Sequence, residues 1–96
     1  MPMTKYTVKP TTKFKKDYKR VRKQGRPMEE MKAVVDLLAD GKPLPDKYDD
    51  HDLTGNWIGY RECHIRPDWL LIYKCMDDVL ILSLTRTGSH DELFEH

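Results

Sequence analysis

The sequence predicts an α+β domain in which a helical hairpin packs on one face of a small antiparallel β-sheet. Two observations support this fold class. Apolar residues recur at helical spacing in the amino-terminal half, and three β-like runs separated by short turns follow in the carboxy-terminal half. A chain of 96 residues with 39% hydrophobic content can build one core, so residues 1–96 are expected to form a single domain.

A short strand and a basic helix are expected first. Tyr6 to Pro10 is a β-like run, and Thr11 or Thr12 can cap the helix that follows. Three apolar residues at helical spacing form its inward face: Phe14, Tyr18 and Val21. The remaining faces are expected to stay in water and to be strongly basic, with Lys13, Lys15, Lys16, Lys19, Arg20 and Lys23.

A second helix and a long loop are expected next. Gly25 and Pro27 end the basic helix, and the second helix should run from about Met28 to Asp40 before Gly41 stops it. Its inward residues are Met31, Val34, Val35 and Leu38. From Lys42 to Trp57 no apolar period is present, which predicts a loop, and long loops in small domains are often functional.

The carboxy-terminal half is expected to be sheet. The predicted strands are Tyr60 to Ile65, Trp69 to Cys75 and Val79 to Thr85. Their connections, Arg66-Pro67-Asp68 and Met76-Asp77-Asp78, are short enough for antiparallel hairpins, and Tyr6 to Pro10 is expected to join as another strand. Ser89 and Glu92 have the spacing of a capping box, so the chain should close with one helical turn.

Charge is divided unevenly along the chain. Residues 1–26 hold ten Lys or Arg against one acid, whereas residues 27–96 hold seven against fifteen. A net +9 followed by a net −8 suggests that one face meets a polyanion such as RNA, although a solvated basic helix would look the same. With no signal peptide, no long apolar run and two widely spaced cysteines, we expect a soluble, cytoplasmic protein with reduced thiols and no membrane contact.

Three of the four histidines lie in the loop-and-sheet half beside acids: His51, His64 and His90. Their spacing matches no metal-ligand signature, so neither metal nor cofactor is expected. The cysteines lie in strands and no serine has a nucleophile-elbow context, which argues against covalent catalysis. The remaining chemistry is general acid–base catalysis on a substrate that supplies its own nucleophile, such as the 2′-hydroxyl of RNA. Exposed histidines beside acids are also common on inert surfaces, so the pattern alone leaves both interpretations open.

Side chains alternate between the two faces of a strand, which predicts the face that each residue of Tyr60 to Ile65 occupies. Glu62 and His64 are expected on the outer face, and Cys63 and Ile65 on the face toward the helices. Arg61 shares the inward parity, so it must lie at the sheet edge, or this assignment of faces is wrong.

Four segments together resemble the YafQ branch of the RelE/ParE toxin superfamily in order and spacing. They are His51-Asp52-Leu53-Thr54-Gly55, Tyr60-Arg61-Glu62-Cys63-His64-Ile65, Pro67-Asp68-Trp69-Leu70-Leu71-Ile72-Tyr73 and Arg86-Thr87-Gly88-Ser89-His90. The resemblance implies a RelE-like fold and a toxin that cuts messenger RNA in the ribosomal decoding site. It also implies that a cognate antitoxin protein holds the toxin inactive.

The resemblance also implies roles for individual residues. By the family's pattern, the catalytic positions are His51, His64, Asp68, Arg86 and His90, of which Arg86 steadies phosphate charge and His90 is expected to be the general acid. Phe94 and Glu62 are placed at the substrate, Glu62 where the family has another acid. The lysines and Arg20 of the basic helix are expected to bind ribosomal RNA.

Two alternatives from other classes stay open on the sequence. A ParE-type toxin has the same fold but binds DNA gyrase and is not a nuclease, and a plain RNA-binding module would bind without cleaving. The histidine set with Asp68 favours the nuclease, because an inhibitor that only binds protein has no chemical need for it.

Overall fold

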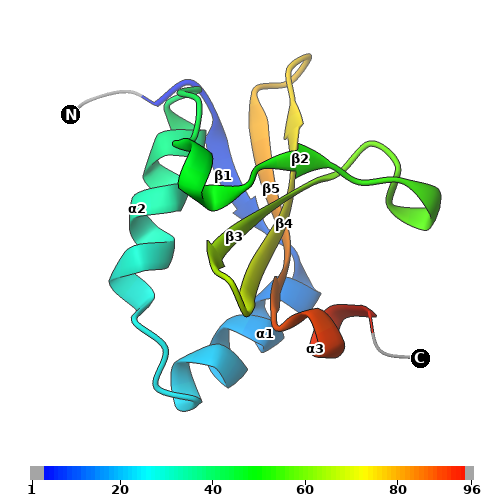
Figure 1. Cartoon of the computed structure of the whole chain (residues 1–96). Helices are drawn as coiled ribbons and strands as arrows, with labels where there is room; N and C mark the ends of the chain where they lie inside the picture. Colours follow the sequence, from blue (N-terminus) through cyan, green and yellow to red (C-terminus); the bar gives the residue numbers. More distant parts are fainter. Residues whose placement is uncertain (1–3, 95–96) are drawn as a thin grey trace.

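The computed structural model describes residues 4–94 and confirms the α+β architecture (Figure 1). In chain order the elements are β1 (Thr7–Pro10), α1 (Thr12–Lys23), α2 (Met28–Ala39), the 3-10 turn η1 (Asp46–Tyr48), β2 (His51–Asp52), the 3-10 turn η2 (Gly55–Trp57), β3 (Arg61–Arg66), β4 (Trp69–Met76), β5 (Ile81–Gly88) and α3 (His90–Phe94). Residues 1–3 and 95–96 of the predicted domain lie outside the described part. Within residues 4–94, no helix is long and apolar enough to cross a membrane.

The sheet has the strand order β1-β5-β4-β3-β2. Strands β3, β4 and β5 pair antiparallel as predicted, and β2, which was not predicted, pairs antiparallel with β3. The prediction of an antiparallel sheet is wrong at β1, which runs parallel to β5, so the sheet is mixed. No hairpin fixes the direction of β1, because it comes from the opposite end of the chain and two helices follow it.

Both long helices pack on one face of the sheet. As predicted, the Thr11 hydroxyl caps α1 by accepting a bond of 3.0 Å from the backbone N–H of Phe14. Figure 1 shows α1 crossing one end of the sheet while α2 runs along its side, so the predicted hairpin is an open one. Between helices and sheet lies the main core, which includes Val21, Val34, Cys63, Trp69, Leu71 and Leu82, all fully buried.

One inward position of α1 differs from the prediction. Phe14 and Val21 are buried, but Tyr18 is 38% exposed and Asp17 is only 2% exposed. The Asp17 carboxylate accepts bonds from Arg86 and from the backbone N–H of Thr87. Because β1 ends where Pro10 pairs with Leu84, α1 lies against the rest of β5, and partners on this strand take the acid inside.

The opposite face of the sheet has a smaller cluster of its own. Its buried residues are Leu70, Ile72 and Leu93, and Leu53, Trp57, Tyr60 and Phe94 pack against them. The capping box predicted for α3 is confirmed: the Ser89 N–H donates to Glu92 Oε1 at 2.8 Å, and the Glu92 N–H donates to Ser89 Oγ at 3.2 Å. The short helix α3 is thereby fixed directly after β5.

Several boundaries of the prediction need correction, among them the end of the last long strand, which is Gly88 and not Thr85. The expected loop from Lys42 to Trp57 contains two 3-10 turns and the two-residue strand β2. The last long strand begins at Ile81 and not at Val79, because the preceding turn spans residues 77–80 and holds Leu80 at a φ of 53°. None of these corrections moves a predicted strand to another place in the sheet.

Gly88 is a position where a side chain should be costly. Its φ is 152°, and a Cβ would lie 2.6 Å from Arg20 Nη2 and 2.9 Å from Glu92 Oε1. Gly88→Ala should lower the free energy of unfolding by about 1–3 kcal/mol, since strained backbone adds to the loss of two hydrogen bonds, from Arg20 Nη2 to the Thr87 carbonyl and from the Ser89 N–H to Glu92 Oε1. Denaturant unfolding measures this.

Gly25→Ala is the matched control, because Gly25 also has a positive φ of 78° but its Cβ would meet nothing within 4 Å. Equal losses of stability in the two variants would show that crowding by Arg20 and Glu92 adds nothing.

Candidate active site

The register of the sheet brings three of the predicted catalytic residues to one end. His64 on β3 pairs with Leu70 on β4, and Leu70 pairs with Gly88 at the end of β5, two residues before His90. The turn that contains Asp68 joins β3 to β4 at this same end, and Figure 1 shows it next to α3.

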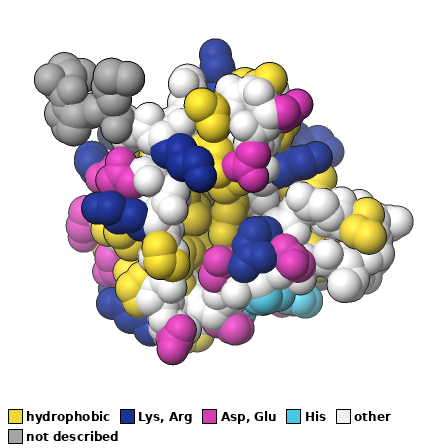
Figure 2. All heavy atoms as spheres, turned by 90° about the horizontal axis from the view of Figure 1, so that it is seen from above, with side chains coloured by type: hydrophobic (Ala, Val, Ile, Leu, Met, Phe, Trp, Pro, Cys, Tyr) yellow, Lys and Arg dark blue, Asp and Glu magenta, His cyan; other side chains and the backbone are white. Residues whose placement is uncertain are grey.

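His51, Glu62 and His64 form a compact cluster. Strand β2 pairs with β3 so that His51 lies opposite Glu62. The Nε2 atoms of both histidines lie 3.4 Å from Glu62 Oε1, and the ring centroids are 6.1 Å apart. Glu62 faces outward as predicted yet is only 6% exposed, because the His51 segment covers it. Histidine side chains gather at one edge of the view in Figure 2, beside basic and acidic side chains.

The segment before His51 is held by a second acid. Asp50 accepts from Arg61 Nη2 at 2.9 Å and from the Tyr73 hydroxyl at 2.5 Å, and Arg61 Nη1 also bonds Asp52 at 2.6 Å. Arg61 does not lie at the sheet edge, because it pairs with Asp52 of β2 on one side and Tyr73 of β4 on the other. It is the first residue of β3 and its side chain stays 37% exposed, so the assignment of Cys63 and Ile65 to the core face still holds. The hydrogen bond from Arg61 to Asp50 is the main reason that the pKa of Arg61 is raised. The pKa of Tyr73 is raised mainly by burial and next by its own hydrogen bond to Asp50.

The orientation of His51 is set locally. Its Nδ1 lies 2.7 Å from the carbonyl oxygen of Asp49, whose φ is 47°. A carbonyl oxygen only accepts, so Nδ1 carries the proton and Nε2 of the neutral ring keeps its lone pair. The Nε2 atom that faces Glu62 is thus available to take a proton.

His90 and Phe94 form the other half of the site. Both lie on α3, with ring centroids 4.9 Å apart, and the Phe94 ring meets the Trp57 ring edge-on at 6.3 Å. His90 is exposed and Phe94 is half-buried on the cluster below the sheet. An exposed imidazole beside an aromatic ring suits a substrate that arrives from solution.

Asp68 and Arg86 are each occupied by an ion pair. Arg26, between α1 and α2, places Nη1 3.5 Å from Asp68 Oδ2, and the Asp68 side chain stays 74% exposed. Arg86 donates to Asp17 through Nε at 2.6 Å and Nη2 at 3.2 Å, which is the main cause of its raised pKa. Sequence reasoning missed Asp17 and Arg26, because their partners are distant in the chain.

The basic helix keeps most of its predicted exposed charge. Lys13, Lys15, Lys16, Lys19 and Lys23 are exposed, as predicted. Arg20 is not free in this way, because it pairs with Asp17 and Glu92 and donates to the carbonyl oxygen of Thr87 at 3.0 Å. Its guanidinium connects α1 with β5 and α3.

Neither cysteine has an activated thiol, and the acids and histidines are not arranged as metal ligands in the described residues. Burial raises the pKa of the Cys63 thiol to about 12 and also raises the pKa of Cys75, so both stay protonated and are poor nucleophiles. Among residues 4–94, no three His, Cys, Asp or Glu side chains are grouped as a metal site would require.

Sequence and fold point to the same group of known proteins. Residues 6–95 match the family described as "Bacterial toxin of type II toxin-antitoxin system, YafQ". The mRNA interferase toxin YafQ of Escherichia coli strain K12 is 44% identical over 82 residues, which are 84% of this chain and 87% of that protein.

Solved structures agree. A metal-bound toxin from Helicobacter pylori superposes with a TM-score of 0.88 at 43% identity, over 93% of this chain and 99% of that one. A chain of the E. coli DinJ-YafQ toxin-antitoxin complex superposes with a TM-score of 0.86 at 40% identity, over 94% and 98% respectively.

Proposed function

This chain belongs to the YafQ family of bacterial type II toxin–antitoxin toxins, and we propose on that premise that it is an endoribonuclease that cleaves messenger RNA by acid–base catalysis. The main support is the pair of imidazole Nε2 atoms, from His51 and His64, each 3.4 Å from the Glu62 carboxylate. A relative named an mRNA interferase toxin, at 44% identity, adds to it.

The proposed general base belongs to the cluster of His51, Glu62 and His64. In the proposed first step, Nε2 of His51 takes the proton of the 2′-hydroxyl, and the resulting oxygen attacks the adjacent phosphorus. Glu62 stabilises the imidazolium that forms, since an opposite charge nearby favours the protonated ring. His64, which shares the same carboxylate oxygen, orients the nucleophile and can replace His51 as base, while Asp68 adds an exposed carboxylate at this end of the sheet.

The acid and the charge-stabilising group come from the other half. His90 is proposed to protonate the departing 5′-oxygen, and Arg86 to donate to the phosphoryl oxygens as negative charge develops. Asp17 occupies Nε and Nη2 of Arg86, so Nη1 is the nitrogen proposed to face the phosphate. Phe94 offers a stacking surface for a base. The proposed steps use no metal ion.

The partners follow from the same family. We propose that a cognate antitoxin holds the toxin inactive, by analogy with the DinJ-YafQ complex, and that the substrate is messenger RNA on the ribosome. The gyrase-binding alternative is not favoured, because the matching relative is named an mRNA interferase. A plain RNA-binding module would leave the histidine cluster without a use.

Programmed ribosomes test the activity directly. Incubation with the protein should produce new messenger ends that bear a 2′,3′-cyclic phosphate or a 3′-phosphate, because the 2′-oxygen is the nucleophile. End-group analysis of the mapped fragments measures this. New ends with a 3′-hydroxyl would exclude 2′-hydroxyl attack, and no new ends would exclude the nuclease.

His90→Ala should slow single-turnover cleavage by roughly 10² to 10⁴, the usual contribution of a general acid. The side chain is exposed, so thermal stability and antitoxin binding should change little. His90→Gln keeps a polar side chain and should be as slow. A loss of less than about tenfold would remove His90 from the role of acid.

The basic helix should contribute long-range attraction to ribosomal RNA. Replacing Lys15, Lys16 and Lys19 by Ala should weaken ribosome binding and flatten its dependence on salt, because fewer counterions are released. Binding assays at several salt concentrations measure both effects. The control replaces the exposed Lys5, Lys32 and Lys42 with Ala, which removes the same charge from other positions. Equal effects in both triple variants would contradict a specific role for α1.

A further inference from the structure

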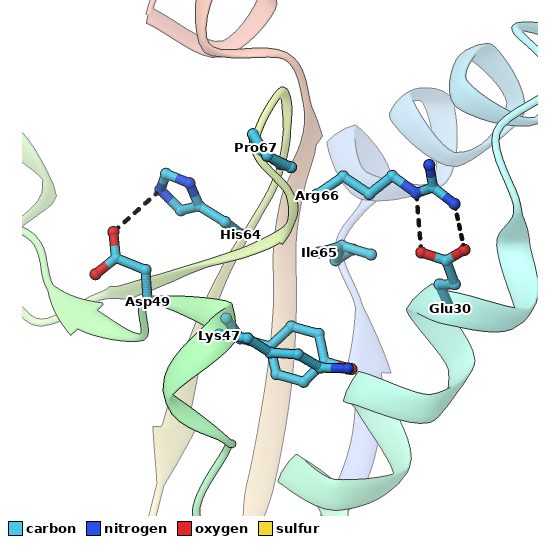
Figure 3. Close-up of a pocket in the computed structure, with 8 residues that line it drawn as sticks. Glu30, Lys47, Asp49, His64, Ile65, Arg66 and Pro67 are labelled. Atoms are coloured by element: carbon cyan, nitrogen blue, oxygen red, sulfur yellow. Dashed lines mark hydrogen bonds and ion pairs between the residues drawn. The ribbon is translucent and has the colours of Figure 1, made fainter.

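A cavity of about 520 Å³ lies beside the His51–Glu62–His64 cluster. It opens where α2, the η1 turn and the end of β3 meet, and its polar and aromatic lining comprises Glu30, Lys47, Tyr48, Asp49, His64 and Arg66. Figure 3 shows Glu30 and Arg66 on one side and His64 with Asp49 on the other. The volume falls in the range of small-ligand sites, about 300–1,000 Å³.

One wall is a fixed pair of hydrogen-bonding groups. Arg66 donates from Nε to Glu30 Oε1 at 2.9 Å and from Nη2 to Glu30 Oε2 at 2.6 Å. The two side chains remain 50% and 37% exposed. Arg66 Nη1 has no hydrogen bond to any of residues 4–94 in the structure, and each Glu30 oxygen keeps a lone pair. The wall therefore presents a donor next to an acceptor.

The other wall belongs to the candidate catalytic cluster. His64 Nε2 lies 3.9 Å from Asp49 Oδ2 and 3.4 Å from Glu62 Oε1. The short strand β2 pairs only with Arg61 and Glu62, so among the described residues no strand covers the edge of β3 next to His64. A chain that places its phosphate at His64 can therefore continue into the cavity.

We propose that this cavity binds the nucleobase of a nucleotide flanking the scissile phosphate, and that Arg66 and Glu30 read the edge of that base. The inference rests on the proposed nuclease activity and assigns a site for sequence preference within it. Unpaired RNA bases are recognised by stacking and by hydrogen bonds to their edges. Tyr48 and Pro67 supply ring surfaces in the cavity, and the Arg66–Glu30 fork supplies a donor and an acceptor side by side.

The test uses ribosomes carrying a messenger library randomised at the codon in the decoding site. Single-turnover cleavage is mapped by sequencing the new ends, for the wild type, Glu30→Gln and Arg66→Lys. Glu30→Gln replaces one acceptor by a donor, and Arg66→Lys keeps the charge but loses the fork. Both should change the base preference at one position beside the cut by about tenfold, as expected for a bidentate contact.

The control is Lys32→Ala, which breaks another exposed ion pair of α2, with Asp36, and should leave the preference unchanged. An unchanged preference in both cavity variants would overturn the proposal while the nuclease stands. If Arg66→Lys keeps the wild-type base preference while Glu30→Gln changes it, Arg66 supplies only charge. That result also overturns the proposal that the two residues read the base together. Loss of antitoxin affinity with unchanged preference would assign the cavity to the antitoxin instead. No cleavage by the wild type would refute the nuclease and this inference with it.

Discussion

The buried carboxylate of Asp17 is the interaction on which the active-site end of this domain depends. A charge that is 2% exposed is tolerated only when it is paired and hydrogen-bonded, and removal of one partner from such a group typically costs about 3–5 kcal/mol. Asp17 meets this need with Arg86, the Thr87 N–H and Arg20. The same contacts fix α1 against the end of β5, and Arg20 continues them to Glu92 on α3. The helix that holds His90 is thus positioned by an acid on the far side of β5.

Different side-chain interactions hold the two halves of the proposed site in place. The half with His51 depends on Asp50, which Arg61 and Tyr73 hold to β3 and β4. The half with His90 depends on the capping box of α3 and on the Arg20–Glu92 pair. Both halves rest on the sheet, whose register sets their separation, and neither requires an enclosed pocket. An open site of this kind suits a substrate that is a long polymer held by a larger particle.

The sequence predicted the parts of the structure that depend on local periodicity. Strand alternation placed Cys63 in the core and His64 outside it, and the spacing of Ser89 and Glu92 predicted the start of α3. It did not predict the burial of Glu62, which depends on a two-residue strand too short to show a period. Nor did it predict that Asp17 would replace Tyr18 in the interior, because the partners of that acid are about 70 residues away. The role of each candidate side chain remains a proposal.

The distribution of charge also constrains the proposed chemistry. Of the ten amino-terminal basic residues, Arg20 and Arg26 are paired with acids inside the domain, so the proposed attraction to RNA depends mainly on the exposed lysines of α1. At the candidate site Asp17 already offsets Arg86, while Glu62 and Asp49 add negative charge beside His51 and His64. A phosphate that approaches these carboxylates needs positive charge there. In the proposed mechanism that charge comes from Nη1 of Arg86 and from the proton that His90 delivers to the departing oxygen, while Glu62 stabilises the imidazole that takes a proton.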